Sequence, residues 1–167
     1  LSAVETLGGT TVICTDKTGT LTQNKLEVEA LAAPGGTWAK SDDAADMPIG
    51  HLQELQYRRL IQIAILCNNS EIIAKKRTIK EIGDPLETGL LKFARRLGED
   101  INELRLKSPK VSEMPFSSET KIMATLHDSP EGKLVFAKGA VEDLLKCCSF
   151  VLDGDKNTPL NPEARKT

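Results

Sequence analysis

Residues 14–24 read Cys14-Thr15-Asp16-Lys17-Thr18-Gly19-Thr20-Leu21-Thr22-Gln23-Asn24. The apolar run over residues 11–14 is typical of a short buried strand, which would carry Asp16 at its carboxyl end. The small and polar residues over 17–22 predict a loop whose backbone N–H groups can meet phosphate oxygens. A carboxylate held there can attack the γ-phosphoryl group of ATP to give an acyl phosphate. On spacing alone, an ordinary strand-to-loop turn explains the run equally well.

The composition of the 167 residues is that of a folded domain, with 40% hydrophobic and 28% charged residues. The net charge is −2 and no long basic patch occurs, so nucleic acid is not expected as a partner. No apolar run approaches the roughly 20 residues of a membrane helix. The four cysteines lack a CxxC spacing, which predicts reduced thiols rather than a zinc site or a disulfide framework.

Taken whole, residues 14–24 resemble the phosphorylation signature of the P-type ATPases, a branch of the haloacid dehalogenase superfamily. The resemblance implies that Asp16 is the nucleophile phosphorylated by ATP. The phosphate loop that it implies consists of Lys17, Thr18, Gly19 and Thr20. It also implies that the Asp16 carboxylate and the Thr18 backbone carbonyl bind Mg²⁺. Soluble phosphatases of the superfamily carry a second aspartate, their general acid–base, where Thr18 stands here. Its absence is consistent with a persistent phosphoenzyme.

Periodicity and turn residues predict the remaining elements. In chain order these are a strand or linker over 25–31, helices over 51–67 and 84–98, strands over 112–116, 121–127 and 133–137, a helix over 140–148, and strands over 150–152 and 158–160. The second helix has Asp84 as a cap, Pro85 at its first position and Glu87 in place to complete a capping box. We place a domain boundary near residue 27, between a first unit (1–27) and a main domain (28–167).

Four further segments resemble the nucleotide-binding domain of the same pumps. The residues that would line an ATP pocket are Glu87, Phe116, Lys121, Lys138 and Gly139. A carboxylate can accept from the adenine amino group, an aromatic ring can stack on a purine, and a lysine can meet phosphates. Gly139 would let the backbone approach the ligand closely. The fourth segment, residues 67–70, is interpreted as the end of a helix.

Each of these residues also has a purely structural interpretation. Glu87 could serve only the capping box, Phe116 could be a core aromatic, and both lysines could be solvated. Gly139 could be required only by a strand-to-helix turn. The order and spacing of Phe116, Lys121 and Lys138 together favour the pocket.

The resemblance implies an α+β fold, with helices packed on an antiparallel sheet that is inserted after the first strand of a Rossmann-like domain. The implied parent is an ATP-driven cation pump, most similar to the calcium-, sodium- and proton-type group. The chain would then be a cytoplasmic piece of an integral membrane protein, whose phosphorylation, actuator and transmembrane domains are its partners. We expect a monomer that binds ATP without turnover, because later motifs of the phosphorylation site are absent from these residues. A soluble phosphatase and a non-enzymatic interaction module are the alternatives.

Overall fold

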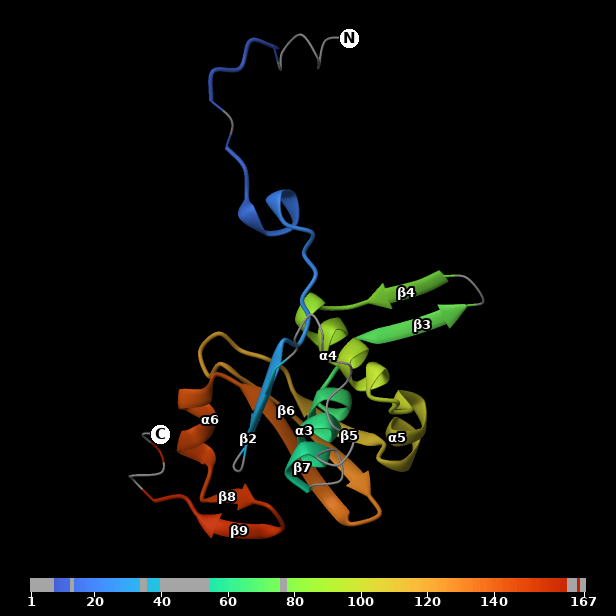
Figure 1. The fold of residues 1–167 in the computed structure, drawn as a ribbon, viewed down its shortest axis with the longest axis vertical. Coiled ribbons are helices and arrows are strands. Elements are labelled where there is room, and N and C mark those ends of the chain that lie inside the picture. The colour runs from blue at the N-terminus through green and yellow to red at the C-terminus, as the bar shows by residue number, and fades with distance from the viewer. Residues whose placement is uncertain are drawn as a thin grey trace.

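The computed structural model describes residues 8–12, 14–33, 36–39, 55–75, 78–161 and 165. The described residues before Ala30 form an N-terminal arm. The arm leads into a body of helices and short sheets (Figure 1). Within the arm, the only regular element among the described residues is a π-helical turn, η1 (Lys17–Leu21). The first turn of the helix predicted over 51–67 lies outside the described residues.

The body combines helices with antiparallel strands, which confirms the α+β part of the predicted fold. The helices are α3 (Leu55–Leu66), α4 (Pro85–Arg96), α5 (Ile101–Lys107) and α6 (Val141–Cys147). The strands are β1 (Ala30–Ala33), β2 (Gly36–Ala39), β3 (Glu71–Lys75), β4 (Thr78–Ile82), β5 (Lys110–Met114), β6 (Ile122–Ser129), β7 (Gly132–Gly139), β8 (Phe150–Asp153) and β9 (Lys156–Pro159).

The largest sheet of the described residues has the strand order β5-β6-β7, with both pairs antiparallel. The β6–β7 hairpin runs in continuous register from Ile122 opposite Gly139 to Ser129 opposite Gly132, which confirms the predicted turn. Three two-stranded pairs, β1–β2, β3–β4 and β8–β9, complete the pairing. The β5 end, the β6 start and the β7 end therefore share one edge of the sheet.

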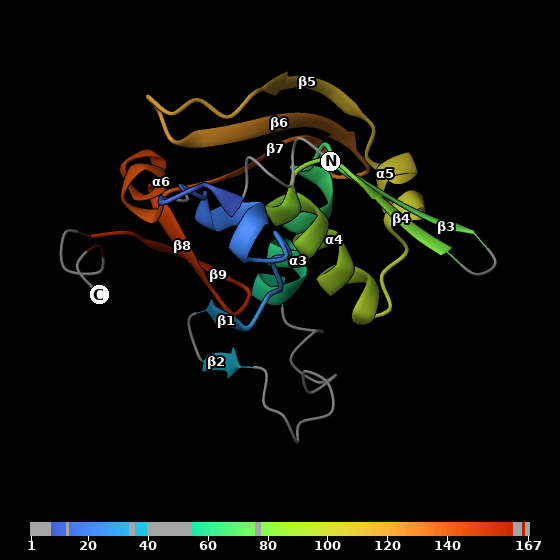
Figure 2. The same cartoon turned by 90° about the horizontal axis from the view of Figure 1, so that it is seen from above.

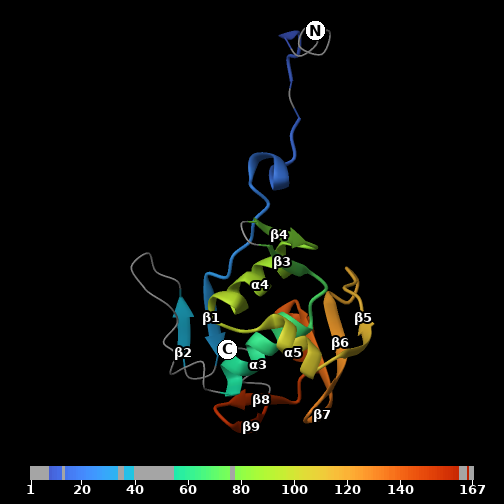
Figure 3. The same ribbon diagram turned by 90° about the vertical axis from the view of Figure 1, so that its right-hand side faces the viewer.

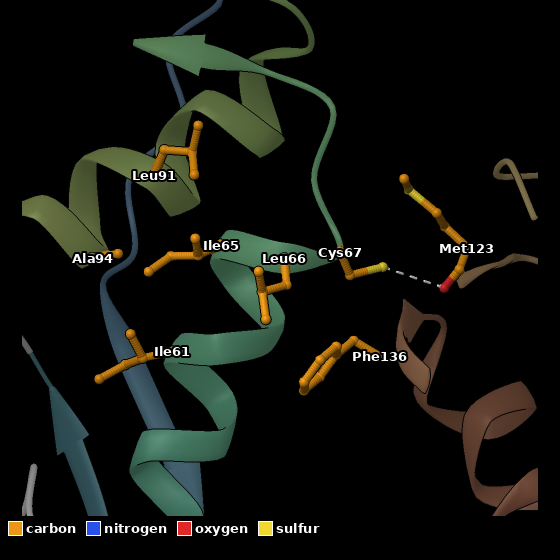
Figure 4. Packing of buried hydrophobic residues seen from close by; sticks show 8 residues of the cluster. All are labelled: Ile61, Ile65, Leu66, Cys67, Leu91, Ala94, Met123 and Phe136. Carbon is orange, nitrogen blue, oxygen red and sulfur yellow. Dashed lines mark hydrogen bonds between the residues drawn. The ribbon is translucent and has the colours of Figure 1, made fainter. Parts of the chain in front are cut away.

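Helix α3 lies between this sheet and α4 (Figures 2 and 3). Strand β6 alternates in burial, and its buried residues Met123, Thr125 and His127 share one face. Thr125 Oγ1 donates to the Leu66 carbonyl, so this face points toward α3. The core cluster joins both helices to the sheet (Figure 4); it contains Ile61, Ile65, Leu66, Cys67, Leu91, Ala94, Met123 and Phe136.

Three features of the body were not predicted from the sequence. The first is the β1–β2 pair, since the prediction for this part of the chain was a single strand or linker over residues 25–31. The β3–β4 hairpin carries charged residues along both strands, which hides the alternation of a half-buried strand. Helix α5 has only seven residues, and its Ile101 and Leu104 pack half-buried against the core, so the stretch is too short to show a helical period. Its start at Asp100, whose carboxylate accepts from the Glu103 N–H, is its clearest signal.

The buried strand predicted over residues 11–14 is wrong for this structure. The described residues of that run, Thr11, Val12 and Cys14, lie in no strand and are exposed, and Val12 is 71% exposed. A parallel strand needs a neighbour to pair with, and every pair in the described part of the chain is antiparallel and uses other residues.

The arm joins the body at α4. Gly89 is buried there, and a Cβ at this position would lie 2.5 Å from the Leu26 carbonyl oxygen. Because such an approach is closer than any side chain allows, glycine is required for the arm to cross the helix at this point.

Candidate functional site

The Glu87 side chain is placed by the start of α4. The Asp84 carboxylate accepts from the backbone N–H groups of Leu86 (2.8 Å) and Glu87 (3.3 Å), and Pro85 occupies the first turn, as predicted. The Glu87 carboxylate itself contacts the turn after α3 and strand β7. The cap therefore sets the direction of the helix, and the Glu87 side chain is left to other partners.

The turn over residues 68–70 holds Glu87 from the side of α3. The Asn69 backbone N–H and the Ser70 hydroxyl both donate to Glu87 Oε2, at 2.9 and 3.1 Å. The Asn68 side-chain amide donates to the carbonyls of Ala64 (2.9 Å) and Glu87 (3.0 Å). The interpretation of residues 67–70 as a helix end is thus correct but incomplete, because the same residues orient Glu87.

Lys138 of β7 closes the site from the sheet. Its Nζ lies 2.6 Å from Glu87 Oε1, and the side chains are only 19% (Lys138) and 10% (Glu87) exposed. Burial by itself raises the pKa of the Glu87 carboxyl. The hydrogen bonds from Lys138, Asn69 and Ser70 outweigh this effect, so the pKa lies below its ordinary value. Glu87 is therefore an ionised carboxylate at neutral pH.

By lone-pair count, the Glu87 carboxylate has one acceptor position that its three donors do not use. A carboxylate offers about four lone-pair sites, two on each oxygen. Oε2 accepts from Asn69 and Ser70, and Oε1 accepts from Lys138. One site on Oε1 remains for a further N–H or O–H donor, and an ionised carboxylate cannot act as a donor there.

The other predicted pocket residues lie at the same edge of the sheet. Lys138 is opposite Met123 in the β6–β7 ladder, and Gly139 is opposite Ile122. A Cβ at Gly139 would meet the Lys121 carbonyl oxygen at 2.2 Å, which explains the glycine structurally. Lys121 itself has a positive φ of 54° and donates its N–H to the Ser117 carbonyl (2.7 Å).

Phe116 lies in the connection from β5 to β6 and is 61% exposed. It is therefore not a core aromatic, and its ring is open to a ligand. Lys121 is also exposed, in the same connection. The sheet edge thus combines an accessible aromatic ring, which can stack on a flat ligand, with an accessible cation and the paired Glu87–Lys138.

The Asp16 segment lies apart, on the arm. Asp16 and Lys17 are exposed, and Asp16 precedes η1 without capping it through its side chain. Gly19 takes a φ of 80°, and its N–H donates to Thr22 Oγ1 at 3.2 Å. Thr20 is exposed as well, and Thr18 belongs to η1. Glu87 and Lys138, by contrast, belong to α4 and β7 of the body.

Comparison with known proteins identifies the family. Residues 56–167 match the family model described as "P-type ATPase, cytoplasmic domain N". The chain belongs to the P-type ATPase family. It is 44% identical over 164 residues to a calcium-transporting ATPase of Listeria monocytogenes, covering 98% of this chain. It is 36% identical over 167 residues to calcium-transporting ATPase 1 of Lactococcus lactis, covering 99% of this chain.

Other cation-transporting P-type ATPases are similar too. Human potassium-transporting ATPase alpha chain 2 is 37% identical over 180 residues, which cover all of this chain. The chain spans 18% of the length of each of the two bacterial relatives and 17% of the human one. The predicted family is therefore confirmed.

Arg105 of α5 braces the turn that holds Glu87 in this P-type ATPase chain. Its guanidinium donates to the carbonyls of Ile65 (3.3 Å), Asn68 (3.4 Å) and Ser70 (3.1 Å). Burial lowers the pKa of Arg105, although nearby Glu71 and Glu87 act in the opposite direction. No residue of α5 was predicted to contribute to the site, because neither Arg105 nor the sequence of its helix carries a recognisable pattern.

A cavity of about 730 Å³ lies elsewhere in the body, and none of the predicted pocket residues lines it. It lies between β3, the end of α4 and α5, and Glu71, Arg95, Asn102 and Arg105 are among its lining residues. Acidic and basic side chains are mixed there, so the cavity has no clear ligand chemistry. We therefore place the candidate functional site at the sheet edge rather than in this cavity.

Within the described part of the chain, no three His, Cys, Asp or Glu side chains gather into a potential metal site. The Asp16 carboxylate and the Thr18 carbonyl are nevertheless oxygen ligands, which suit Mg²⁺, and Mg²⁺ commonly binds through one or two carboxylates and substrate phosphates. None of the helices in the described residues is long and apolar enough to cross a membrane.

Proposed function

We propose that this chain is the ATP-binding part of an ATP-driven cation pump whose phosphorylated residue is Asp16. The observation that carries the proposal is the Glu87–Lys138 pair, at 2.6 Å, whose carboxylate also accepts from Asn69 and Ser70. A buried carboxylate that is fixed by three donors and keeps one open position is suited to a single ligand N–H. Membership of the P-type ATPases supports ATP as that ligand.

ATP would lie along the edge of the sheet. The 6-amino group of adenine would donate to Glu87 Oε1, and the exposed ring of Phe116 would stack on the purine. Lys138 would form the floor of the pocket, next to Gly139, where the backbone approaches closely. Lys121, exposed in the connection before β6, would meet the phosphates as a point charge.

The phosphoryl transfer that we propose for the parent protein uses Asp16 as the nucleophile. A carboxylate oxygen of Asp16 forms a bond to the γ-phosphorus, and the bond from this phosphorus to the bridging oxygen breaks. ADP leaves with the electron pair, and an aspartyl phosphate remains. Mg²⁺, held by the Asp16 carboxylate and the Thr18 carbonyl, would offset the charge between carboxylate and phosphate. Backbone N–H groups of residues 17–20 would bind the phosphate oxygens.

The proposed parent is an integral membrane protein with this chain on its cytoplasmic side. Residues 1–27 would begin a Rossmann-like phosphorylation domain, and residues 28–167 would form the nucleotide-binding domain. The isolated chain is expected to be monomeric and to bind ATP without turnover, because Asp16 lies on the arm and the pocket residues lie in the body. The transported ion is proposed to be calcium, since two relatives are named calcium-transporting ATPases.

Two lysines of β7 provide a matched test. Lys138 contacts Glu87, whereas Lys133 of the same strand forms an exposed pair with Asp128 of β6. We expect Lys138→Gln to weaken ATP binding by roughly tenfold, since a hydrogen bond to a charged group contributes about 1.5–3 kcal/mol. Lys133→Gln is expected to change the Kd by less than about twofold. Isothermal titration calorimetry with ATP measures both.

Equal Kd values for the two variants would contradict the proposed pocket. The same samples test for turnover, because the release of phosphate from ATP can be followed after the titration. We expect no steady release from the unmodified chain. Steady release that Asp16→Asn abolishes would contradict the expectation that the chain binds ATP without turnover.

A further inference from the structure

Ser70 has an unusual position for a serine. It is fully buried, and its hydroxyl donates to Glu87 Oε2 at 3.1 Å, with the Asp84 carbonyl as a more distant partner at 3.5 Å. A hydroxyl has one proton to donate, and the charged acceptor at the shorter distance is favoured. The Ser70 proton is therefore directed at Glu87.

The backbone around Ser70 is fixed from two sides. Its N–H donates to Asn68 Oδ1 at 2.8 Å, and its carbonyl accepts from Arg105 at 3.1 Å. Gly83 makes room for the side chain, because a Cβ at Gly83 would lie 2.2 Å from Ser70 Oγ. The positive φ of Gly83, 119°, is also a conformation that favours glycine. The Ser70 hydroxyl is therefore held beside Glu87 Oε2.

We infer that Ser70 is a positioning residue that acts through Glu87 and sets the preference of the site for a 6-amino purine over a 6-oxo purine. The inference rests on the proposed function. With Asn69 and Ser70 both on Oε2, the carboxylate cannot turn about its terminal torsion without losing two hydrogen bonds. The one free acceptor site therefore stays on Oε1, beside Lys138.

Without the Ser70 hydroxyl, the orientation of the Glu87 carboxylate would no longer be fixed. Oε2 would keep only the Asn69 N–H, and the carboxylate could rotate to share the Lys138 ammonium between its oxygens. A 6-amino group would then find its acceptor in place only part of the time. A 6-oxo group, which offers no proton at this position, gains nothing from the orientation of Glu87 and would be unaffected.

The test compares ATP with inosine triphosphate, which carries an oxygen in place of the 6-amino group. The unmodified chain is expected to bind ATP more tightly than inosine triphosphate by about tenfold. Ser70→Ala should lower this ratio by roughly fivefold, through a weaker affinity for ATP and an unchanged affinity for inosine triphosphate. Ser70→Cys, of similar size and with a weak S–H donor, should give an intermediate ratio.

Ser149→Ala is the control, because Ser149 is exposed in the connection between α6 and β8. An unchanged nucleotide ratio in Ser70→Ala would overturn the inference, since a merely structural role alters both affinities alike. If Ser70→Ala does not fold, an unchanged ratio in Ser70→Cys overturns it equally. If the unmodified chain binds neither nucleotide, the proposed function fails together with the inference. If it binds ATP but shows no Ser70 dependence, the inference alone fails.

Discussion

Glu87 is the residue on which the polar contacts of the site converge. Its carboxylate joins the turn after α3 to strand β7, and its own position is set by the Asp84 cap of α4. Its partners are three donors, so the charge of Glu87 is compensated while the group stays largely buried. This arrangement links the ionisation of one carboxyl to the free energy of unfolding.

We predict that Glu87→Gln reduces the free energy of unfolding at pH 7 by about 1–3 kcal/mol, because Lys138 loses its charged partner. The pKa of Glu87 is lower in the folded chain than its ordinary value of 4.5. Its contribution is therefore present above about pH 4.5 and is lost as the pH falls through the folded value. Urea unfolding of both proteins from pH 7 to pH 3 measures the difference.

The difference in stability between the unmodified chain and Glu87→Gln should shrink on acidification. Glu103→Gln is the matched control, since Glu103 forms an exposed pair with Lys107 within α5. A difference that stays constant down to pH 3 would show that the Glu87 carboxylate does not depend on these three donors.

At the scale of elements, α3 and α4 pack through their most buried side chains. Ile65 and Leu91 have no exposed surface, and the Cys67 thiol, at the end of α3, donates to the Met123 carbonyl at 3.6 Å. Because the turn over residues 68–70 follows α3 and Glu87 starts α4, this packing sets the distance between the donors and the carboxylate. The core beneath the site therefore supports the site's geometry.

Leu91→Ala is predicted to destabilise the chain by about 2–5 kcal/mol, because it leaves a cavity between α3 and α4. Leu106→Ala on α5 is the control, since that side chain is 82% exposed and should change stability by less than about 0.5 kcal/mol. Thermal unfolding of the two variants distinguishes them. Equal melting temperatures would mean that Leu91 is not part of a cooperative core.

The sequence predicted elements whose signals are local. The Asp84-Pro85 start of α4, the apolar face of α3 and the turn between β6 and β7 each follow from nearby residues. The β3–β4 hairpin and α5 could not be predicted, because they are stabilised by contacts with α3 and α4 rather than by their own pattern. The strand over residues 11–14 was predicted wrongly, because an apolar run alone does not supply a partner strand.

Prediction of the site was limited in the same way, because contacts between residues far apart in the sequence have no local signal. Resemblance supplied Glu87, Phe116, Lys121 and Lys138, but the ion pair between Glu87 and Lys138 joins residues 51 positions apart and has no local signal. Ser70 was not predicted either, although Gly83 hints at it, because only the folded chain shows which side chain the missing Cβ accommodates.

At the scale of the whole molecule, the residues proposed to react and to bind ATP lie in two places, the arm and the body (Figure 1). The exposed Asp16 lies on the arm, and the pocket residues lie at one edge of the main sheet. The proposed function places the phosphorylation site and the nucleotide site on different domains, so it requires a movement that brings the γ-phosphate to Asp16.

An amide NMR titration of the chain with ATP shows where on the body the nucleotide binds. We predict that the signals of Phe116, Lys121 and Lys138 shift progressively, because ATP lies against the edge of the sheet where they stand. Signals of Asp16 and of the β8–β9 pair should stay in place. If the Phe116, Lys121 and Lys138 signals remain unmoved while others shift, ATP binds elsewhere and the assignment of the pocket is contradicted.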